Sequence, residues 1–160
     1  MPLTFNIRHI EAKDLHLEGE LPCEELELDL HDEVIHPAGA LRYDLEVQNI
    51  EGAILVQGEL ELPLEFDCVR CLKKFKESLR LENWVCHLPL IGEDATPVSN
   101  DLVNLTPYIR EDILLALPQH PLCEPECGGL KPPARAKDPG RTSEKAVSAW
   151  DELDKLKLKN

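Results

Sequence analysis

Hydrophobic and polar residues alternate through the middle of the chain. The apolar positions are Leu41, Tyr43, Leu45 and Val47 and, after the turn-prone pair Glu51 and Gly52, Leu60, Leu62, Leu64 and Phe66. A period of two gives each strand one buried and one wet face. The polar positions of the second segment include Glu59, Glu61, Glu65 and Asp67, and the alternation occurs earlier at Leu26, Leu28 and Leu30. The pattern predicts an antiparallel sheet with an acidic outer face.

The periodicity becomes helical after residue 105. Thr106 and Pro107 suit the N-cap and the first position of a helix, and Pro118 ends the segment. The residues that share one face between these limits are Ile109, Ile113, Leu114 and Leu117. One short helix covering the sheet is the expected structure.

The chain changes character near residue 130. The segment GGLKPPARAKDPG at 128–140 is too rich in Gly, Pro and charge to pack, which is typical of a linker. Ser143 can then cap a final helix with one apolar stripe, formed by Ala146, Trp150, Leu153 and Leu156. We therefore expect a β-rich domain at 1–130, a linker at 131–142 and a C-terminal helical tail at 143–160.

Length and composition suit one ordinary domain. The chain has 160 residues, of which 42% are hydrophobic and only 4% aromatic, so the core should consist of Leu, Val and Ile. Neither a basic start followed by an apolar run nor eighteen consecutive apolar residues occurs. A cytoplasmic protein without a membrane contact is expected, in a compartment that keeps cysteines reduced.

The net charge of -14 argues against generic nucleic-acid binding, because acidic side chains repel phosphate. The charge is uneven along the chain. Residues 1–130 hold 26 acidic and 9 basic residues, a net charge of -17, whereas residues 131–160 hold 5 and 8, a net charge of +3. The tail therefore differs electrostatically from the body.

Four of the six cysteines form two closely spaced pairs. Cys68 and Cys71 lie in CVRC, and Cys123 and Cys127 lie in CEPEC. Two tight turns of this kind supply the four sulfur ligands that a structural zinc ion prefers, and Gly128 and Gly129 would suit a turn with positive φ. The alternative is that the pairs are reduced, metal-free thiols at hairpin ends. The two isolated cysteines, Cys23 and Cys86, are better explained as small buried hydrophobic residues.

These features together predict an α+β fold. It would consist mainly of an antiparallel β-sheet, open or barrel-like, with one short helix covering it, a two-pair cysteine zinc site and the C-terminal helical tail.

Three stretches of the chain, together with the strand pattern at 41–67, resemble a known family. They are CVRCLKKF at 68–75, DLVNLTPYIREDILLALPQHPLC at 101–123 and AWDELDKLKLKN at 149–160. The family is the YceD family, whose name describes accumulation of large-subunit ribosomal RNA. The resemblance implies a non-enzymatic role in large ribosomal subunit biogenesis, in bacteria or plastids, and a small ribosomal protein as a candidate partner.

The chain also departs from that family. Many relatives place further cysteines after the second pair, where this chain reads LKPPAR, and some lack part of the four. The resemblance therefore implies a metal that braces the fold rather than one that takes part in chemistry.

A group of basic residues follows the first cysteine pair. Its members are Arg70, Lys73, Lys74, Lys76 and Arg80. If 72–81 is a strand, Lys74, Lys76 and Arg80 share its outer face while Phe75, Leu79 and Leu81 face the core. This basic stripe, formed by Lys74, Lys76 and Arg80, could contact RNA phosphates. It could equally be a solvated edge whose lysines prevent aggregation, and no exposed aromatic is interleaved for base stacking.

The tail also has two interpretations. Trp150 and its apolar stripe could dock on the chain's own sheet, or the helix could bind a partner such as ribosomal RNA or a pre-ribosomal particle.

The residues of an enzyme site are missing from the sequence. It contains no Gly-x-Ser-x-Gly, no phosphate-binding glycine loop and no His-Glu-x-x-His, and four thiolates would close a zinc ion to substrate. We therefore expect neither catalysis nor a small-molecule substrate. Two hypotheses remain: binding of ribosomal RNA or a pre-ribosomal particle through the basic stripe and tail, and a protein-only adaptor whose acidic sheet holds a basic ribosomal protein.

Overall fold

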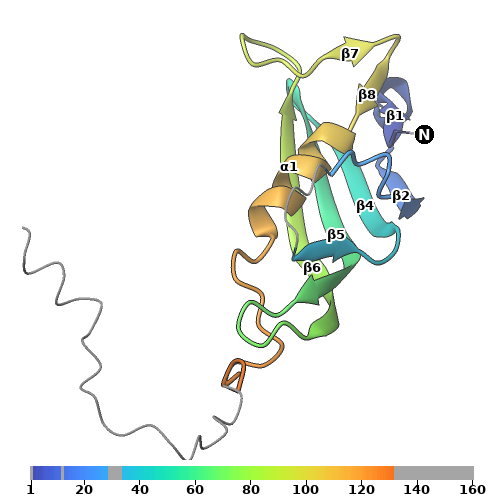
Figure 1. Cartoon of the computed structure of the whole chain (residues 1–160). Helices are drawn as coiled ribbons and strands as arrows, with labels where there is room; N and C mark the ends of the chain where they lie inside the picture. The colour runs from blue at the N-terminus through green and yellow to red at the C-terminus, as the bar shows by residue number, and fades with distance from the viewer. Residues whose placement is uncertain (1, 12, 29–33, 132–160) are drawn as a thin grey trace, which may run out of the picture. The chain divides into compact units, whose positions relative to one another are not determined.

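A computed structural model describes residues 2–11, 13–28 and 34–131 (Figure 1). The main sheet has five strands, which are β2 (Leu15–Leu21), β3 (Ile35–Pro37), β4 (Leu41–Ile50), β5 (Ala53–Asp67) and β6 (Lys74–Pro89). A smaller sheet has the order β1 (Thr4–Asn6), β8 (Leu102–Asn104) and β7 (Val98–Ser99). A 3-10 helix, η1 (Ile7–Ile10), follows β1, and the α-helix α1 (Thr106–Ala116) follows β8. All strand pairs are antiparallel.

Strand β5 is the centre of the main sheet. It pairs with β6 from Ala53 to Asp67, while its other side pairs first with β4 and then with β3. The predicted turn is present, because Ile50 pairs with Ala53 across Glu51 and Gly52. The apolar positions of the second predicted segment are all buried, namely Leu60, Leu62, Leu64 and Phe66. The alternation therefore identified both the strands and their core faces.

The expectation of a strand at Leu26 and Leu28 was wrong. Leu26 and Leu28 lie in and just after a turn that spans residues 23–27, and Glu27 has a positive φ of 44°. Leu26 is nevertheless buried in the core, so a turn can place a leucine inward without strand pairing. Leu30 lies outside the described residues.

The main sheet is open, so a barrel-like arrangement is not found. In the described part of the chain, β2 and β3 lie at one side of the sheet and β6 lies at the other, and no pairing joins the two sides. Helix α1 lies across the sheet (Figure 1), and its Ile109 and Ile113 belong to the same core cluster as the sheet residues. The helix covers apolar surface that a barrel would have enclosed by closure.

Helix α1 confirms the predicted short covering helix but begins differently. Thr106 is its first residue rather than its N-cap, and its hydroxyl oxygen accepts a hydrogen bond from the Leu3 amide at 2.9 Å. The Asn104 side chain accepts from the Thr106 amide at 3.0 Å. The indole N–H of Trp84 donates to Asp112 at 2.6 Å, which ties β6 to the helix.

The predicted linker beyond Lys131, the tail at 143–160 and Trp150 lie outside the described residues. Within the described residues, no helix has both the length and the apolar character needed to cross a bilayer.

Candidate metal centre

The first cysteine pair lies in the connection between β5 and β6. Cys68 directly follows β5, and its carbonyl accepts the Leu72 amide at 2.9 Å while its own amide donates to the Lys73 carbonyl at 2.9 Å. Leu72 has a φ of 62°, in the left-handed region that normally favours glycine. The chain thus reverses tightly enough to bring the Cys71 thiol back toward Cys68.

The second pair follows α1. The Val69 amide donates to the Pro121 carbonyl at 3.1 Å, which attaches this segment to the first turn. The Cys127 amide donates to the Glu124 carbonyl at 3.1 Å, closing a second turn. Gly129 has the expected positive φ, at 79°, whereas Gly128 does not. Only one of the two glycines is therefore required by the backbone conformation.

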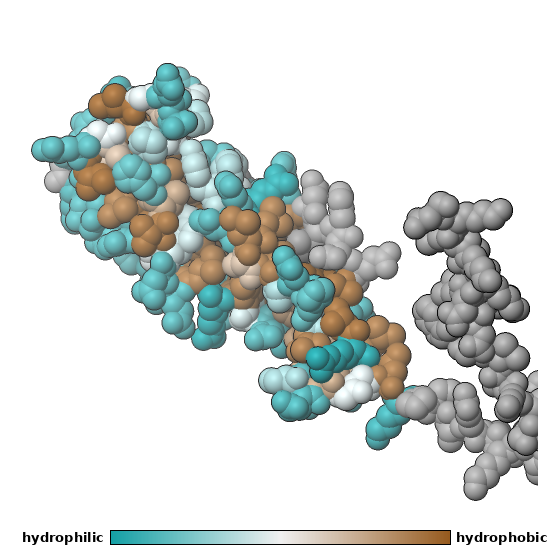
Figure 2. All heavy atoms as spheres, turned by 90° about the vertical axis from the view of Figure 1, so that its left-hand side faces the viewer, coloured by the Kyte–Doolittle hydropathy of each residue, from teal (hydrophilic) through white to brown (hydrophobic). Residues whose placement is uncertain are grey.

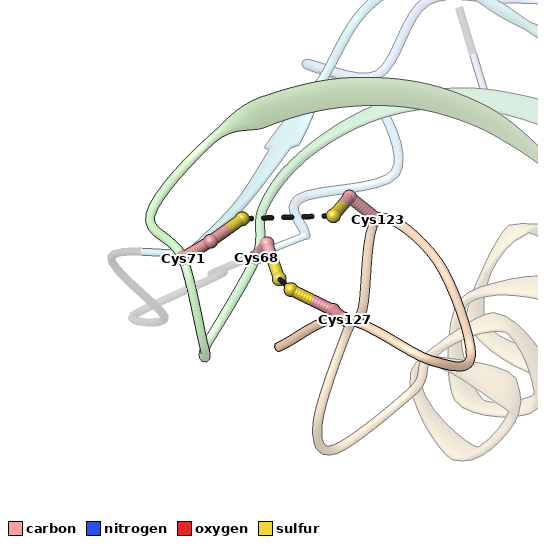
Figure 3. Close-up of side chains that lie close together, drawn as sticks. All are labelled: Cys68, Cys71, Cys123 and Cys127. Carbon is pink, nitrogen blue, oxygen red and sulfur yellow. Dashed lines mark hydrogen bonds between the residues drawn. The ribbon is translucent and has the colours of Figure 1, made fainter. Parts of the chain in front are cut away.

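The four sulfur atoms converge on one point (Figure 3). All lie within 4.8 Å of one another. The Cys68 and Cys127 sulfurs are 3.7 Å apart, and those of Cys71 and Cys123 are 3.6 Å apart. Sulfurs at the usual zinc distance of about 2.3 Å from the centre of a tetrahedron are separated by about 3.8 Å, whereas a disulfide requires about 2.05 Å. The four cysteines could therefore hold a metal ion.

The surroundings shift the pKa values of three clustered cysteines in different directions, lowering that of Cys68 and raising those of Cys123 and Cys127. A hydrogen bond from the backbone of Cys123, assisted by the backbones of Cys71 and Arg70, lowers the pKa of Cys68 to about 6. A hydrogen bond with the Cys71 side chain, together with burial, raises the pKa of Cys123 to about 12. Hydrogen bonds with the Gly129 backbone and the Cys123 thiol lower the pKa of Cys127, but burial and the thiols of Cys71 and Cys68 outweigh them and raise this pKa.

We expect metal binding at about pH 7.5 to release at least two protons per chain. Only thiolates ligate zinc, and at this pH Cys68 is already ionised while Cys123 and Cys127 still carry protons. As pH falls below about 6, Cys68 also becomes protonated, so the apparent affinity should fall more steeply. Calorimetric titration of the metal-free protein in buffers of different ionisation enthalpy measures the proton number. A heat that is independent of the buffer would contradict ligation by these cysteines.

The basic stripe lies on the outer face of β6, beside the acidic residues of β5. Lys74 is 3.6 Å from Glu65 and 3.9 Å from Asp67. Arg80 is 3.0 Å from Glu61. As predicted, Phe75, Leu79 and Leu81 pack toward the core. Acidic and basic residues therefore form one mixed-charge surface rather than two separate ones.

The remaining basic residues of the group differ from one another. Arg70 donates to the Cys127 carbonyl at 3.0 Å, so its guanidinium joins the two cysteine turns. This bracing contact was not predicted, since nothing in the local sequence indicates which carbonyl an arginine will reach. Lys73 and Lys76 are exposed and form no ion pair within the described part of the chain.

The two isolated cysteines lie apart from the cluster. Cys86 is buried, as expected, and burial and the nearby Asp112 carboxylate raise its pKa to about 11. Cys23 is only half-buried, and its thiol donates to the Gly39 carbonyl at 2.8 Å.

The comparison with known families bears on residues 56–157. These residues match the family described as large ribosomal RNA subunit accumulation protein YceD. The chain belongs to the YceD family. The match begins within β5 and takes in both cysteine pairs, the basic stripe and α1.

The chain is also similar to proteins of two mycobacteria. The chain is 29% identical over 150 residues to uncharacterized protein Rv2926c of Mycobacterium tuberculosis (strain ATCC 25618 / H37Rv) and to uncharacterized protein Mb2951c of Mycobacterium bovis (strain ATCC BAA-935 / AF2122/97). Each alignment covers 78% of this chain and 72% of the relative. No solved structure matches the chain significantly.

Proposed function

We propose that this chain is a non-enzymatic factor in large ribosomal subunit biogenesis and ribosomal RNA accumulation, and that it binds ribosomal RNA or a pre-ribosomal particle. Membership of the YceD family carries this proposal. Chemistry at the cysteine cluster is not part of it, because four thiolates leave a zinc ion no open position for substrate.

Zinc in this proposal has a structural role. Cys68 and Cys71 belong to the β5–β6 turn, whereas Cys123 and Cys127 follow α1. A metal bound by all four would link the end of the central hairpin to the segment that leaves the helix. It would thereby hold Lys73 in a fixed position beside the cluster, as a phosphate contact requires.

The RNA contact is assigned to the end of β6 next to the cysteine turns. Lys73 and Lys76 form no ion pair with a described residue, so neither would have to give up such a contact to bind a phosphate. Lys74 and Arg80 hold exposed ion pairs, which contribute only about 0–1 kcal/mol and can exchange for a phosphate. The tail, with Trp150, is a second candidate for the contact.

Reversing the charge of Lys73 and Lys76 to glutamate is expected to weaken RNA binding by at least tenfold without changing thermal stability, because both side chains are exposed. Loss of two phosphate contacts should also reduce the log-log salt slope by about 1.4 to 1.8. Binding of labelled ribosomal RNA fragments at several salt concentrations, and sedimentation with large-subunit particles, provide the measurements.

Lys13→Glu is the matched control. Lys13 lies just before Leu15, the first residue of β2. Leu15 pairs with Val47 of β4, and Val47 pairs with Val56 of β5. Val56 is about 36 Å along β5 from Asp67, which pairs with Lys74 at the start of β6. One reversal changes the net charge by 2 and the double reversal changes it by 4. A loss of binding free energy from Lys13→Glu that is half as large as that from the double variant, or larger, would therefore show a general charge effect and contradict the assignment.

The protein-only adaptor remains the second candidate function, favoured by the acidic outer face. Three of its carboxylates already pair with β6, namely Glu61, Glu65 and Asp67. Neutralising these three together with Glu59 would free Lys74 and Arg80, so RNA should bind more tightly. A basic ribosomal protein should instead be lost, and the same variant therefore distinguishes the two functions.

A further inference from the structure

A groove of about 880 Å³ lies between α1, the turn at residues 24–27 and the N-terminal segment at Pro2. Its apolar lining includes Leu26, Pro107, Leu114 and Leu115. Neither the four clustered cysteines nor the basic stripe contributes to it. The groove is therefore a feature separate from the metal centre and the proposed RNA contact.

Two leucines of the groove are not used by the core. Leu115 is 77% exposed and Leu114 is 38% exposed, whereas Ile109 and Ile113 of the same helix are buried against the sheet. Leu114 was predicted to share the buried face, and its exposure overturns that prediction. In Figure 2, hydrophobic groups, drawn in brown, emerge among hydrophilic ones on the face toward the viewer. Neighbouring exposed leucines beside a hollow are typical of an interaction surface.

The polar lining of the groove is strongly acidic. It contains four glutamates, at positions 24, 25, 27 and 111, and one arginine, Arg110, which gives a local charge of -3. Arg110 is 3.8 Å from Glu27. Glu24 and Glu111 are exposed and form no ion pair with any described residue. The apolar floor thus has unneutralised carboxylates on two sides, one on the turn and one on the helix.

We propose that this groove binds a basic amphipathic helix of a protein partner. Apolar side chains on one face of that helix would cover Leu114 and Leu115, while lysines or arginines beside them would reach Glu24 and Glu111. Helix α1 has 11 residues and a length of about 16 Å, which matches about three turns of the partner.

Charge disfavours the other occupants. The groove's glutamates would repel RNA phosphates, and the body of a second copy, residues 1–130 with a net charge of -17, offers little basic surface. The predicted tail helix at 143–160 holds four acidic and four basic residues, so its net charge of zero suits the acidic groove less well than a basic helix does. The proposed helix is independent of the RNA contact, since Lys73 and Lys76 do not line the groove. Loss of one binding event should therefore leave the other intact.

The probe is a fluorescent peptide of about 14 residues, made of leucine and lysine, with all leucines on one helical face. Its affinity for the full-length chain is measured by fluorescence anisotropy. We expect it to bind at least tenfold more tightly than a peptide of the same composition whose leucines are dispersed around the helix. A third peptide with glutamate in place of lysine should not bind measurably. Equal affinity for the first two would overturn the proposal, because it would show binding by charge alone.

Variants of the chain locate the site. Leu115→Ser should weaken peptide binding at least fivefold, and Glu111→Gln should weaken it and reduce its salt dependence. The matched control is Ile91→Ser, which removes another hydrophobic side chain that is 78% exposed but does not line the groove. It should change nothing. Unchanged binding by Leu115→Ser, with all variants folded by circular dichroism, would place the peptide elsewhere and refute the assignment.

Two further outcomes would replace the proposed occupant. Direct binding of a fluorescent RNA oligonucleotide that is retained in the variant with Lys73→Glu and Lys76→Glu but lost in Leu115→Ser would identify the groove as an RNA site. Self-association in sedimentation experiments that Leu115→Ser abolishes would identify a second copy of the chain. Either result contradicts the proposal, whereas loss of RNA binding in the lysine variant with normal peptide binding leaves it standing.

Discussion

Cys71→Ser is expected to abolish stoichiometric zinc binding and to destabilise the fold by about 4 kcal/mol or more, since the loss of a metal is among the few changes that produce effects of this size. The sulfur of Cys71 is 3.6 Å from that of Cys123 and lies within 4.8 Å of the other two. A hydroxyl is a poor zinc ligand in a four-sulfur site. Without the metal, the β5–β6 turn and the segment after α1 would lose their link.

Elemental analysis should find about one zinc per wild-type chain and less than about a tenth of that in the variant, and urea unfolding gives the stability difference. Cys23→Ser is the matched control, because Cys23 is also half-buried but lies outside the cluster. Its thiol donates to the Gly39 carbonyl, which a serine hydroxyl can also do. A wild-type protein that contains no zinc and is no more stable than the Cys71→Ser variant would contradict the metal assignment.

Gly58→Ala is expected to destabilise the main sheet by about 4 kcal/mol or more, at the upper end of what single substitutions do. Gly58 has a φ of 153°, and the pairing of β5 with β6 shifts register between Gly58 and Leu60. An added Cβ would overlap the carbonyl oxygen of Asp44 and come within 2.9 Å of the Leu45 Cα. Both obstacles are backbone atoms of β4, which cannot move aside without disrupting strand pairing.

Gly92→Ala separates the two causes of this loss. Gly92 also has a positive φ, at 110°, but no atom lies within 4 Å of an added Cβ. Its substitution should therefore cost only the backbone strain, about 1–3 kcal/mol. The midpoints of urea unfolding for the two variants provide the comparison. Equal losses would show that the close approach of β4 to β5 contributes nothing.

The sequence by itself determined the main secondary structure. Alternation over 41–67 identified β4 and β5, and the period of the segment after 105 identified α1, because each pattern records which side of an element is buried. It also indicated a metal site, since two short-spaced cysteine pairs can supply four ligands. The structure brings those four sulfurs together. The predictions made from the sequence depend on residues close to one another in the chain, such as the members of one strand, one helix or one cysteine pair.

Only the tertiary structure decided which distant residues are neighbours. The alternation placed Glu61 and Arg80 on outer faces, but the register between β5 and β6 made them a pair. The sequence pattern placed Leu114 on the same helix face as Ile113, but Leu114 lines the groove, because the sheet covers only part of α1. The open sheet arises in the same way: periodicity assigns each strand a core face, whereas closure into a barrel depends on whether the two edge strands meet in space.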